Sequence, residues 1–490
     1  MNLYSRRQFI SNTAAASAGV SLFSILPQAR AAGSANDEIG IGLVGLGWKG
    51  GGHLKSILKE KGVRIVAICD PDTDLMAQGQ EVLKEAGQNA REYRDMRHMF
   101  DDSAVDAVVI STPNHWHALA TIWACQAGKD VYVEKPVTHN LWEGGKMVEA
   151  ARKYGRMVQA GTQNRSDVGF RAAMKYINEG NLGKMLWTHG FWYKYRPDGD
   201  TVTGPQPIPL TVDYNLWTGP APLTPLMRKN LHYDWHWHWD TGNGDFGNLG
   251  GHKVDDSMNV IGANGPPTRF LCIGGLYGHN NDGWQTPNIE AVFIEFENKP
   301  PVIVDVRSLP AKAGAKYEVD MRKARKGNVI QCEGGYFTGG RGGGILYDND
   351  GNRIKQFPGD GGKTHFQNWV DAIRTRNRNS MLAEIELSVN SASICHLANI
   401  AYRSGLPTTA GDIVDAVGSC EHSVETVEGI VKQVRDNGFD LDKSPLTCSG
   451  WMTYDAGKMK FSGGSDYGQT VANALVQPHY RAPFIVPDRI

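Results

Sequence analysis

Short apolar runs alternate with amphipathic segments along the first third of the chain. Each run has the length of one buried strand, and each intervening segment has the apolar spacing of a helix that packs one face on a sheet. Strands alternating with helices predict an α/β fold with a doubly wound parallel sheet, and ligands bind beyond the carboxyl ends of such strands. The predicted strands are 39–44, 63–69, 105–110, 130–133 and 157–160.

From residue 184 onwards the alternation is looser and richer in aromatic residues, and prolines are frequent over 204–225. Runs of this kind, joined by long loops, predict a second domain of α+β type with a mostly antiparallel sheet. Its clearest strand-like runs are 269–276, 289–297 and 301–307. The glycine-rich segment 339–344 lacks the strand and helix that flank a phosphate-binding loop, so we interpret it as a flexible connection.

The turn after the first predicted strand has the sequence Gly45-Leu46-Gly47-Trp48-Lys49-Gly50. Gly45 permits the tight turn, Gly47 lets a pyrophosphate approach the backbone, and Gly50 lets helix and strand pack closely. The amides of the following helix favour an anionic ligand. Asp70 ends the second strand, where an acid binds the adenosine ribose hydroxyls of NAD. We therefore predict a dinucleotide cofactor, with NAD favoured over NADP because no arginine directly follows Asp70.

Charge and composition narrow the class of partner. Among the 490 residues, 51 Lys and Arg are balanced by 52 Asp and Glu, which gives no electrostatic reason to bind nucleic acid or an anionic membrane. Thirteen tryptophans suggest surfaces on which a ligand can stack. We expect a small molecule as the partner.

The first 31 residues have the parts of a twin-arginine export signal. Arg6-Arg7 precedes an apolar stretch over 14–26 and a small-x-small cleavage site at 29–31. We predict export, to the periplasm or beyond, and no membrane span in the mature protein, because no later apolar run reaches roughly 18 residues. This pathway carries folded proteins, often with a cofactor already inserted, so we expect the cofactor to be tightly bound.

Polar residues follow two predicted strands, at 111–117 and 134–136. With the glycine turn, the motifs Thr-Pro-Asn-x-x-His (112–117) and Glu-Lys-Pro (134–136) resemble the Gfo/Idh/MocA oxidoreductase family, which includes glucose–fructose oxidoreductase and inositol dehydrogenase. The resemblance implies that Lys135 reaches the reacting hydroxyl of a sugar or polyol. It also implies a cofactor site made of Gly45, Leu46, Gly47, Trp48, Gly50, Asp70, Thr112, Asn114, His117, Glu134 and Gln163.

The segment 242–255 resembles the family's helix that carries an aspartate and, four positions on, a histidine; here the pair is Asn248 and His252. We predict these two and Lys135 as the catalytic residues, with His252 as general base and Lys135 as donor to the developing alkoxide. Asn248 can orient a hydroxyl but cannot hold an imidazolium electrostatically. Asp255 or Asp256 could supply the missing carboxylate, and a purely structural His252 is the alternative.

Residues 235–240 read Trp-His-Trp-His-Trp-Asp. If this segment is extended, the three indoles share one face and the polar side chains share the other. Indoles stack on sugar rings, which favours a carbohydrate-binding wall. Two alternatives stay open: a tryptophan core face with a wet polar face, or a metal site at His236 and His238 that lacks an evident third ligand; we expect no metal. The predicted substrate-binding residues are Lys135, Arg165, Trp235, His236, His238, Asp240 and Asn248.

The chain is divided as a signal peptide (1–31), a Rossmann domain (36–162), a substrate-binding α+β domain (163–408) and a C-terminal extension (409–490). The resemblance implies that the second sheet is open, that helices within 363–405 pack back on the first domain, and that the protein is a homo-oligomer. The extension ends in an aromatic and proline-rich part, 473–487, which we interpret as an arm over the protein or a subunit contact.

Three functions are compatible with these residues. The first is an exported NAD(P)-dependent oxidoreductase that acts on a sugar or glycoside hydroxyl by hydride transfer and retains its cofactor. The second is an NAD-dependent glycoside hydrolase, which oxidises a ring hydroxyl transiently, eliminates the aglycone, adds water and reduces the ketone again. The third is a sugar-binding protein without catalysis. Lys135 and His252 argue against the third function, and we favour the first over the second.

Overall fold

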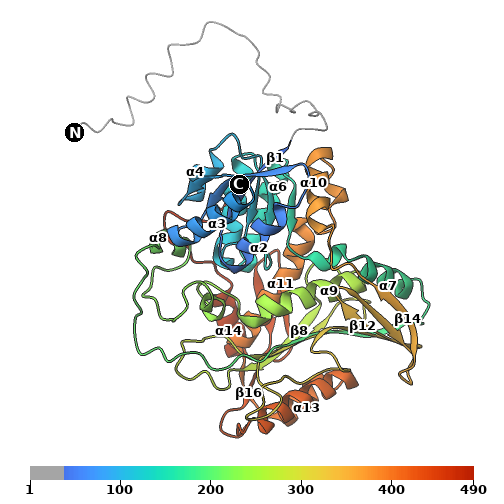
Figure 1. Cartoon of the computed structure of the whole chain (residues 1–490). Coiled ribbons are helices and arrows are strands. Elements are labelled where there is room, and N and C mark those ends of the chain that lie inside the picture. The colour runs from blue at the N-terminus through green and yellow to red at the C-terminus, as the bar shows by residue number, and fades with distance from the viewer. Residues whose placement is uncertain (1–37) are drawn as a thin grey trace. The chain divides into compact units, whose positions relative to one another are not determined.

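The computed structural model describes residues 38–490 and has the predicted α/β fold (Figure 1). The first domain contains a six-stranded parallel sheet in the order β3-β2-β1-β4-β5-β6. Helices cover both faces, which is why its central strands are continuous apolar runs. The strands are β1 (Ile39–Val44), β2 (Val63–Cys69), β3 (Arg91–Tyr93), β4 (Ala107–Ile110), β5 (Asp130–Val133) and β6 (Val158–Ala160).

Short polar residues set where the helices of this domain begin. Asp72 accepts the N–H of Asp74 at the start of α3, and Asn140 and Glu143 form a reciprocal capping box at the start of α6. By contrast, α2 and α5 begin without a side-chain cap, which leaves their first amides open to a ligand. The helices are α2 (Trp48–Ile57), α3 (Thr73–Glu85), α4 (Met96–Phe100), α5 (Asn114–Gln126) and α6 (Leu141–Lys153).

The second half of the chain forms a twelve-stranded sheet in the order β14-β13-β12-β11-β7-β10-β9-β8-β16-β15, with β17 and β18 beside β8. Neighbouring strands are antiparallel except β7 and β10, which run parallel. The strands are β7 (Met185–Tyr193), β8 (Arg269–Gly275), β9 (Ile289–Glu295), β10 (Val302–Arg307), β11 (Lys326–Cys332), β12 (Gly335–Gly340), β13 (Gly343–Tyr347), β14 (Arg353–Pro358), β15 (Leu406–Thr408), β16 (Leu446–Cys448), β17 (Met452–Asp455) and β18 (Lys460–Gly463).

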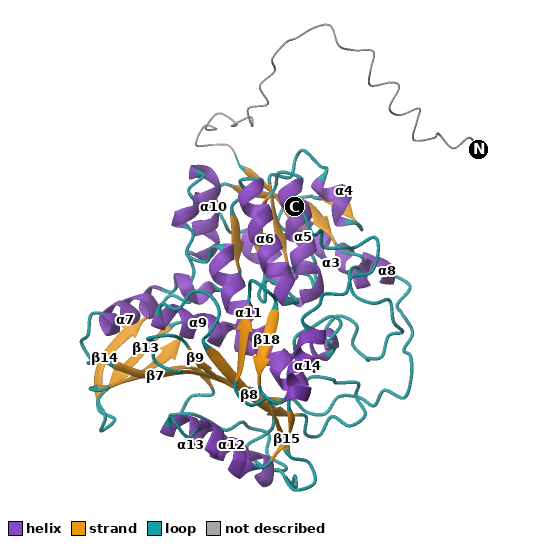
Figure 2. Ribbon diagram, turned by 180° about the vertical axis from the view of Figure 1, so that it is seen from behind, coloured by secondary structure: helices purple, strands orange, loops and turns teal. Residues whose placement is uncertain are grey.

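Helices lie on both sides of this sheet (Figure 2). On one side, α7 (Val168–Asn178), α9 (Gly251–Ile261) and α11 (Ile385–Ser404) share a core with the sheet. On the other side, α12 (Ala410–Val417) and α13 (Glu421–Asp436) bury apolar residues of β8, β9 and β10. The remaining helices are α8 (Tyr214–Thr218), α10 (His365–Thr375) and α14 (Asp466–Leu475), with short 3-10 helices at Gln163–Ser166, Asp234–Trp237 and Arg378–Ser380 and a π-helical turn at Phe246–Gly250.

Two later segments return to the first domain. In α10, Trp369 is fully buried against this domain, and its indole N–H donates to the Met157 carbonyl (3.0 Å). The last residues run across α5 and α6, where Phe484 packs on Trp116 and Tyr480 donates to Glu143. The C-terminal segment is therefore an arm over the protein, which was one of the two interpretations.

Two expectations about local structure are wrong. Residues 235–240 are not extended: Asp234–Trp237 is a 3-10 helix, and the rings of Trp235 and His236 stack 3.7 Å apart, which an extended segment would place on opposite faces. The segment 339–344 is a β12–β13 hairpin rather than a flexible connection. Glycine is needed there because a Cβ on Gly343, with φ +88°, would lie 1.9 Å from the Phe357 carbonyl oxygen.

The predicted export signal, residues 1–31, lies outside the described residues. Between residues 38 and 490, no helix has the length and apolar character needed to cross a membrane.

Candidate active site

A pocket of about 720 Å³ lies at the carboxyl ends of β1, β2, β4 and β5 and extends to the second sheet. The three predicted catalytic residues, Lys135, Asn248 and His252, all line it. Although they are distant in sequence, the fold therefore brings them to one cavity. Of the predicted cofactor residues, the pocket is lined by Gly45, Gly47, Trp48, Asp70, Thr112, Asn114, His117, Glu134 and Gln163.

The glycine turn fits a dinucleotide. Gly45 has φ +84°, and a Cβ on Gly50 would lie 1.8 Å from the Gly45 carbonyl oxygen, so both positions require glycine for the turn itself. A Cβ on Gly47 would meet nothing within 4 Å, which leaves open space beside the backbone where a pyrophosphate would approach. Leu46 and Gly50 do not line the pocket; they shape the turn from behind.

Asp70 ties the end of β2 to this turn. Its carboxylate accepts the N–H of Leu46 (2.8 Å) and the N–H of Asp72 (2.9 Å). Burial raises the pKa of Asp70 to about 6, although both of these hydrogen bonds oppose the rise. The side chain lies where the ribose of a dinucleotide bound at the turn would be.

Glu134 is held by two side chains from α2. His53 Nε2 lies 2.7 Å and Lys49 Nζ lies 3.2 Å from Glu134 Oε1. Burial alone would raise the pKa of Glu134, but the charge of Lys49 and the hydrogen bond from His53 outweigh it and hold the pKa well below its usual value. Glu134 is therefore an anion beside Lys135.

Lys135 crosses from the first domain to the second. Its Nζ donates to the backbone carbonyl of Asn248 (2.6 Å) and to the side-chain oxygen of Asn248 (3.0 Å). Burial lowers the pKa of Lys135 to about 8, with Glu134 opposing the shift and Lys49 adding to it. A lysine with this pKa exchanges a proton near neutral pH.

His252 lies in the first turn of α9 beside Trp192, with ring centroids 5.9 Å apart. Burial, followed by the positive charges of Lys135 and Lys253, holds the pKa of His252 well below its usual value. The imidazole is therefore neutral at physiological pH and can accept a hydrogen bond, but it holds a proton weakly.

Two further predicted residues fix the loops of the nicotinamide side. The ring nitrogens of His117 lie 2.8 Å from the Thr112 carbonyl and 2.6 Å from the Pro136 carbonyl, so His117 connects the loop after β4 with the loop after β5. Asn114 donates to the side chain of Asn243 (2.9 Å) in the second domain. Both line the pocket while serving these contacts.

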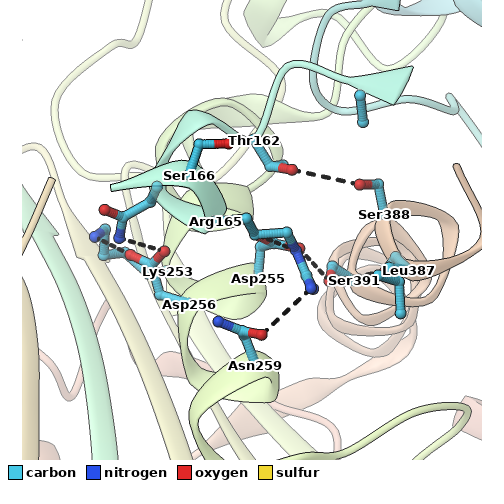
Figure 3. Close-up of polar contacts among 12 residues, drawn as sticks. Thr162, Arg165, Ser166, Lys253, Asp255, Asp256, Asn259, Leu387, Ser388 and Ser391 are labelled. Atoms are coloured by element: carbon cyan, nitrogen blue, oxygen red, sulfur yellow. Dashed lines mark hydrogen bonds and ion pairs between the residues drawn. The ribbon is translucent and has the colours of Figure 1, made fainter. Parts of the chain in front are cut away.

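Arg165 does not reach the pocket, contrary to its predicted place among the substrate-binding residues. Figure 3 shows it directed at Asp255 of α9, to which it donates through Nε and Nη2. Asp256 of the same helix pairs with Lys253 (2.6 Å) and accepts from Asn164. Neither aspartate lines the pocket, so neither stands in for the carboxylate that Asn248 replaces.

The side chains of residues 235–240 lie in different parts of the molecule because the segment turns. Trp235 and His236 line the pocket, as predicted. Trp237 instead stacks on Trp284, 4.0 Å away, and His238 is buried behind it. Asp240 borders a separate cavity of about 460 Å³. Within residues 38–490, no group of three or more His, Cys, Asp or Glu side chains is placed to hold a metal ion.

Several pocket residues had not been predicted. Among them are Trp192, Lys194, Arg196, Tyr233 and Arg341. A signal for three of them exists in the sequence, since Trp192, Lys194 and Arg196 alternate with tyrosines across the end of a strand and so point to one side. Arg341 has no such signal, because the register of the β12–β13 hairpin decides its position.

Comparison with known proteins assigns two domains of the chain to one family. Residues 39–162 match the family model described as "Oxidoreductase family, NAD-binding Rossmann fold", and residues 169–268 match the model "Oxidoreductase family, C-terminal alpha/beta domain". These two domains belong to the Gfo/Idh/MocA oxidoreductase family. The motifs that resembled this family thus lie in domains that match its models, and the first of these domains is described as NAD-binding.

The curated relatives have names that describe different activities. Inositol 2-dehydrogenase of Salmonella typhimurium is 33% identical over 154 residues, which cover 31% of this chain and 45% of that protein. The 2,7-anhydro-N-acetylneuraminate hydratase of Mediterraneibacter gnavus is 32% identical, covering 32% and 41%. Glycosyl hydrolase family 109 protein 2 of Shewanella sp. is 30% identical, covering 31% and 34%. The chain spans less than half the length of these relatives.

Solved structures share the fold. The WlbA dehydrogenase from Bordetella pertussis, in complex with NADH and UDP-GlcNAcA, matches 74% of this chain and 96% of its own with a TM-score of 0.55 and 17% identity. Biliverdin reductase from Synechocystis, with biliverdin and NADP+, matches with a TM-score of 0.54 and 15% identity. At these identities the likeness concerns the fold alone.

Proposed function

We propose that this protein is an exported oxidoreductase that removes a hydride from the carbon bearing a sugar hydroxyl, keeps its NAD bound, and passes the hydride to a second organic acceptor, such as another sugar, before the next turnover. The observation that carries the proposal is the position of Lys135, with a pKa of about 8, in one pocket with His252 and the glycine turn. Export rests on the leader at 1–31. NAD is favoured over NADP because the buried carboxyl of Asp70 lies where a ribose 2′-phosphate would have to sit.

Lys135 can act on a substrate oxygen in either protonation state. Two of its N–H groups are directed at the two oxygens of Asn248. The third tetrahedral position on Nζ carries a hydrogen when the lysine is charged and a lone pair when it is neutral. At that position Lys135 either donates to a substrate oxygen or accepts the proton of a substrate hydroxyl, without moving.

The electrostatics favour Lys135 over His252 as the final holder of that proton. A general base works best when its pKa lies near the working pH, which fits Lys135 at about 8. His252 was the base in the prediction from the sequence, but its pKa is held well below the usual value. We assign His252 the role of hydrogen-bond acceptor, which orients the hydroxyl and relays its proton.

The nicotinamide ring of a bound NAD supplies the hydride acceptor. The residues that would hold the cofactor are the turn Gly45–Trp48, Asp70 at the ribose, and Thr112, Asn114 and Glu134 along the nicotinamide side. Glu134 stays ionised and, through its ion pair with Lys49 and its hydrogen bond with His53, fixes the start of α2 against the loop that carries Lys135.

Retention of the cofactor is supported by residues 204–240, here named the strap. The strap supplies seven residues to the pocket that the glycine turn also lines: Leu216, Trp217, Asn230, His232, Tyr233, Trp235 and His236. It is attached to the end of β2, where His232 lies 2.9 Å from Asp72 and the N–H of Thr73 donates to the Thr211 carbonyl. A dinucleotide under this segment would leave only after these contacts open.

The C-terminal arm holds the strap from outside. Arg481 donates to the side chain of Asn215 (2.7 Å) and to its carbonyl (2.9 Å), and the Arg481 N–H donates to the Pro220 carbonyl (3.0 Å). The strap is thus fastened both to the first domain and to the end of the chain, which supports slow exchange of the cofactor.

Redox-assisted glycoside cleavage is the second candidate function. It is favoured by the relatives named as a family 109 glycosyl hydrolase and as a hydratase, because both names describe an outcome other than net oxidation. The same Lys135 and His252 would serve transient oxidation of a ring hydroxyl. A further base would then remove the proton next to the ketone.

One experiment separates the two functions. The purified protein, without added NAD, is incubated with free sugars and with aryl glycosides, and both aglycone release and the redox state of the bound nicotinamide are followed. A keto-sugar with accumulation of reduced nicotinamide supports the oxidoreductase. Aglycone release with no net change in nicotinamide supports the glycosidase, and no reaction with either class contradicts both.

A further inference from the structure

The charges around the pocket are distributed unevenly between the two domains. All the acidic residues that line it, Asp70, Asp95 and Glu134, belong to the Rossmann domain, where the cofactor would lie. The wall from the second domain contributes Lys194, Arg196 and Arg341 and no acidic residue. The side of the pocket that would face a substrate is therefore positive.

Only one of these three cations forms an ion pair with a carboxylate among the described residues. It is Arg196, because Asp245 accepts from its Nε (2.6 Å) and its Nη2 (2.8 Å). Lys194 and Arg341 have no carboxylate within 4.0 Å among residues 38–490. Two exposed cationic side chains at the substrate side thus make no ion pair within the described residues.

The backbone explains why Lys194 faces the cavity. Past the end of β7 the chain continues in an extended path, since the N–H groups of Lys194 and Arg196 donate to the carbonyls of Arg307 and Ser308 (both 2.9 Å). Side chains alternate along such a path, so Trp192, Lys194 and Arg196 form one row on the pocket side. Lys194 lies next to Trp192, whose ring neighbours His252.

Arg341 approaches from the tip of the β12–β13 hairpin. Asp167 holds this tip, accepting the N–H of Gly342 (2.9 Å) and the N–H of Gly361 (2.7 Å). The Nε of Arg341 donates to the Gly361 carbonyl (2.8 Å), which fixes the direction of the side chain. The hairpin therefore presents an oriented guanidinium at the pocket, a group that matches the oxygens of a carboxylate, sulfate or phosphate.

We propose that the substrate is a sugar carrying a negative charge, and that Lys194 and Arg341 recognise its anionic group while Trp192 stacks on its ring. This inference rests on the proposed function, because it assigns the substrate class of the same site. A neutral sugar would leave the two cations unpaired. An anionic sugar forms charge-assisted hydrogen bonds with them that a neutral sugar cannot form.

The test compares matched sugars with the wild-type holoenzyme, in the presence of an added electron acceptor that reoxidises the bound nicotinamide: glucose, glucuronate, glucose 6-sulfate and glucose 6-phosphate. We expect kcat/KM for at least one anionic sugar to exceed that for glucose by at least about tenfold, and the advantage to shrink at high salt. The anionic sugar that reacts fastest identifies the acid group. Equal or faster turnover of glucose would overturn the inference.

Variants locate the recognition. In Lys194→Gln and Arg341→Gln the preference for the anionic sugar should fall by about tenfold, through KM rather than kcat, while retention of NAD is unchanged. Lys363→Gln is the control, since Lys363 is exposed near Gly361 but does not line the pocket. An unchanged preference in both variants, or the same loss in the control, would overturn the assignment.

If no sugar of either class is oxidised, the proposed function fails, and binding of the same sugars is measured by calorimetry instead. Tighter binding of an anionic sugar that is lost in Lys194→Gln and Arg341→Gln still supports the inference. Binding of glucose as tightly as of the anionic sugars contradicts it.

Discussion

The Nζ of Lys135 lies 2.6 Å from the backbone carbonyl of Asn248 and 3.0 Å from its side-chain oxygen. The lysine follows β5 in the first domain and the asparagine precedes α9 in the second, so this pair connects the domains inside the pocket. An amide at position 248 is neutral. It accepts a hydrogen bond from the lysine without the charge that would hold the ammonium protonated, which is consistent with a pKa of about 8 for Lys135.

The substitution Asn248→Asp should raise the pKa of Lys135. A carboxylate at hydrogen-bond distance favours the charged ammonium, so the rising limb of kcat/KM against pH, which we expect near pH 8, should move up by about one unit or more. The pH profile of both proteins measures this. Asn181→Asp, at an exposed position outside the pocket, should leave the profile as in the wild type, and an unmoved limb in Asn248→Asp would show that Lys135 is not the titrating group.

Opening the strap should speed the loss of cofactor. His232→Ala removes the contact with Asp72, a partly exposed pair, so we expect NAD to dissociate about three- to tenfold faster. Dissociation is followed by exchange of the bound NAD with labelled NAD. Lys229→Ala, an exposed position in the same strap, is the control. An unchanged exchange rate in His232→Ala would mean that the strap does not retain the cofactor.

Glu290, in the middle of β9, makes stability depend on pH. Burial raises its pKa to about 8, and its one hydrogen bond among the described residues comes from Cys272. The folded state therefore binds a proton that the unfolded state has released between about pH 4.5 and 8. The free energy of unfolding should fall across that window by roughly 1.4 kcal/mol for each pH unit from this group, and no further above it.

The variant Glu290→Gln cannot lose that proton, so its stability relative to the wild type should improve as pH rises and level off above about pH 8. Urea unfolding at about pH 6 and about pH 9 measures the difference. Glu295→Gln, at the end of the same strand beside Arg269, should keep the wild-type slope. A constant difference between Glu290→Gln and the wild type at both pH values would refute the assignment.

The sequence predicts those features of the fold that depend on local pattern. Buried parallel strands such as β1 and β4 are continuous apolar runs, and the turn at Gly45 is set by conformations that only glycine adopts easily. The resemblance to the family identified Lys135 and His252, which the fold brings to one pocket. These features need few contacts between distant segments.

Features that depend on distant partners escaped prediction. The segment 235–240 turns because Trp237 stacks on Trp284 and its carbonyl accepts the N–H of Gln285, which local alternation does not encode. Arg165 is withdrawn from the pocket by Asp255, a residue 90 positions later. The position of Arg341 follows from a hairpin register that composition alone does not reveal.

The central claim is that Lys135 takes the proton of a sugar hydroxyl beside a retained nicotinamide. It is tested most directly by single-turnover reduction of the bound cofactor in the wild type and in Lys135→Met, with NAD retention measured in parallel. We predict that the variant keeps its NAD but forms reduced nicotinamide about 10²- to 10⁴-fold more slowly, the usual cost of losing a general base. Reduction at the wild-type rate in Lys135→Met, with NAD still bound, would contradict the account.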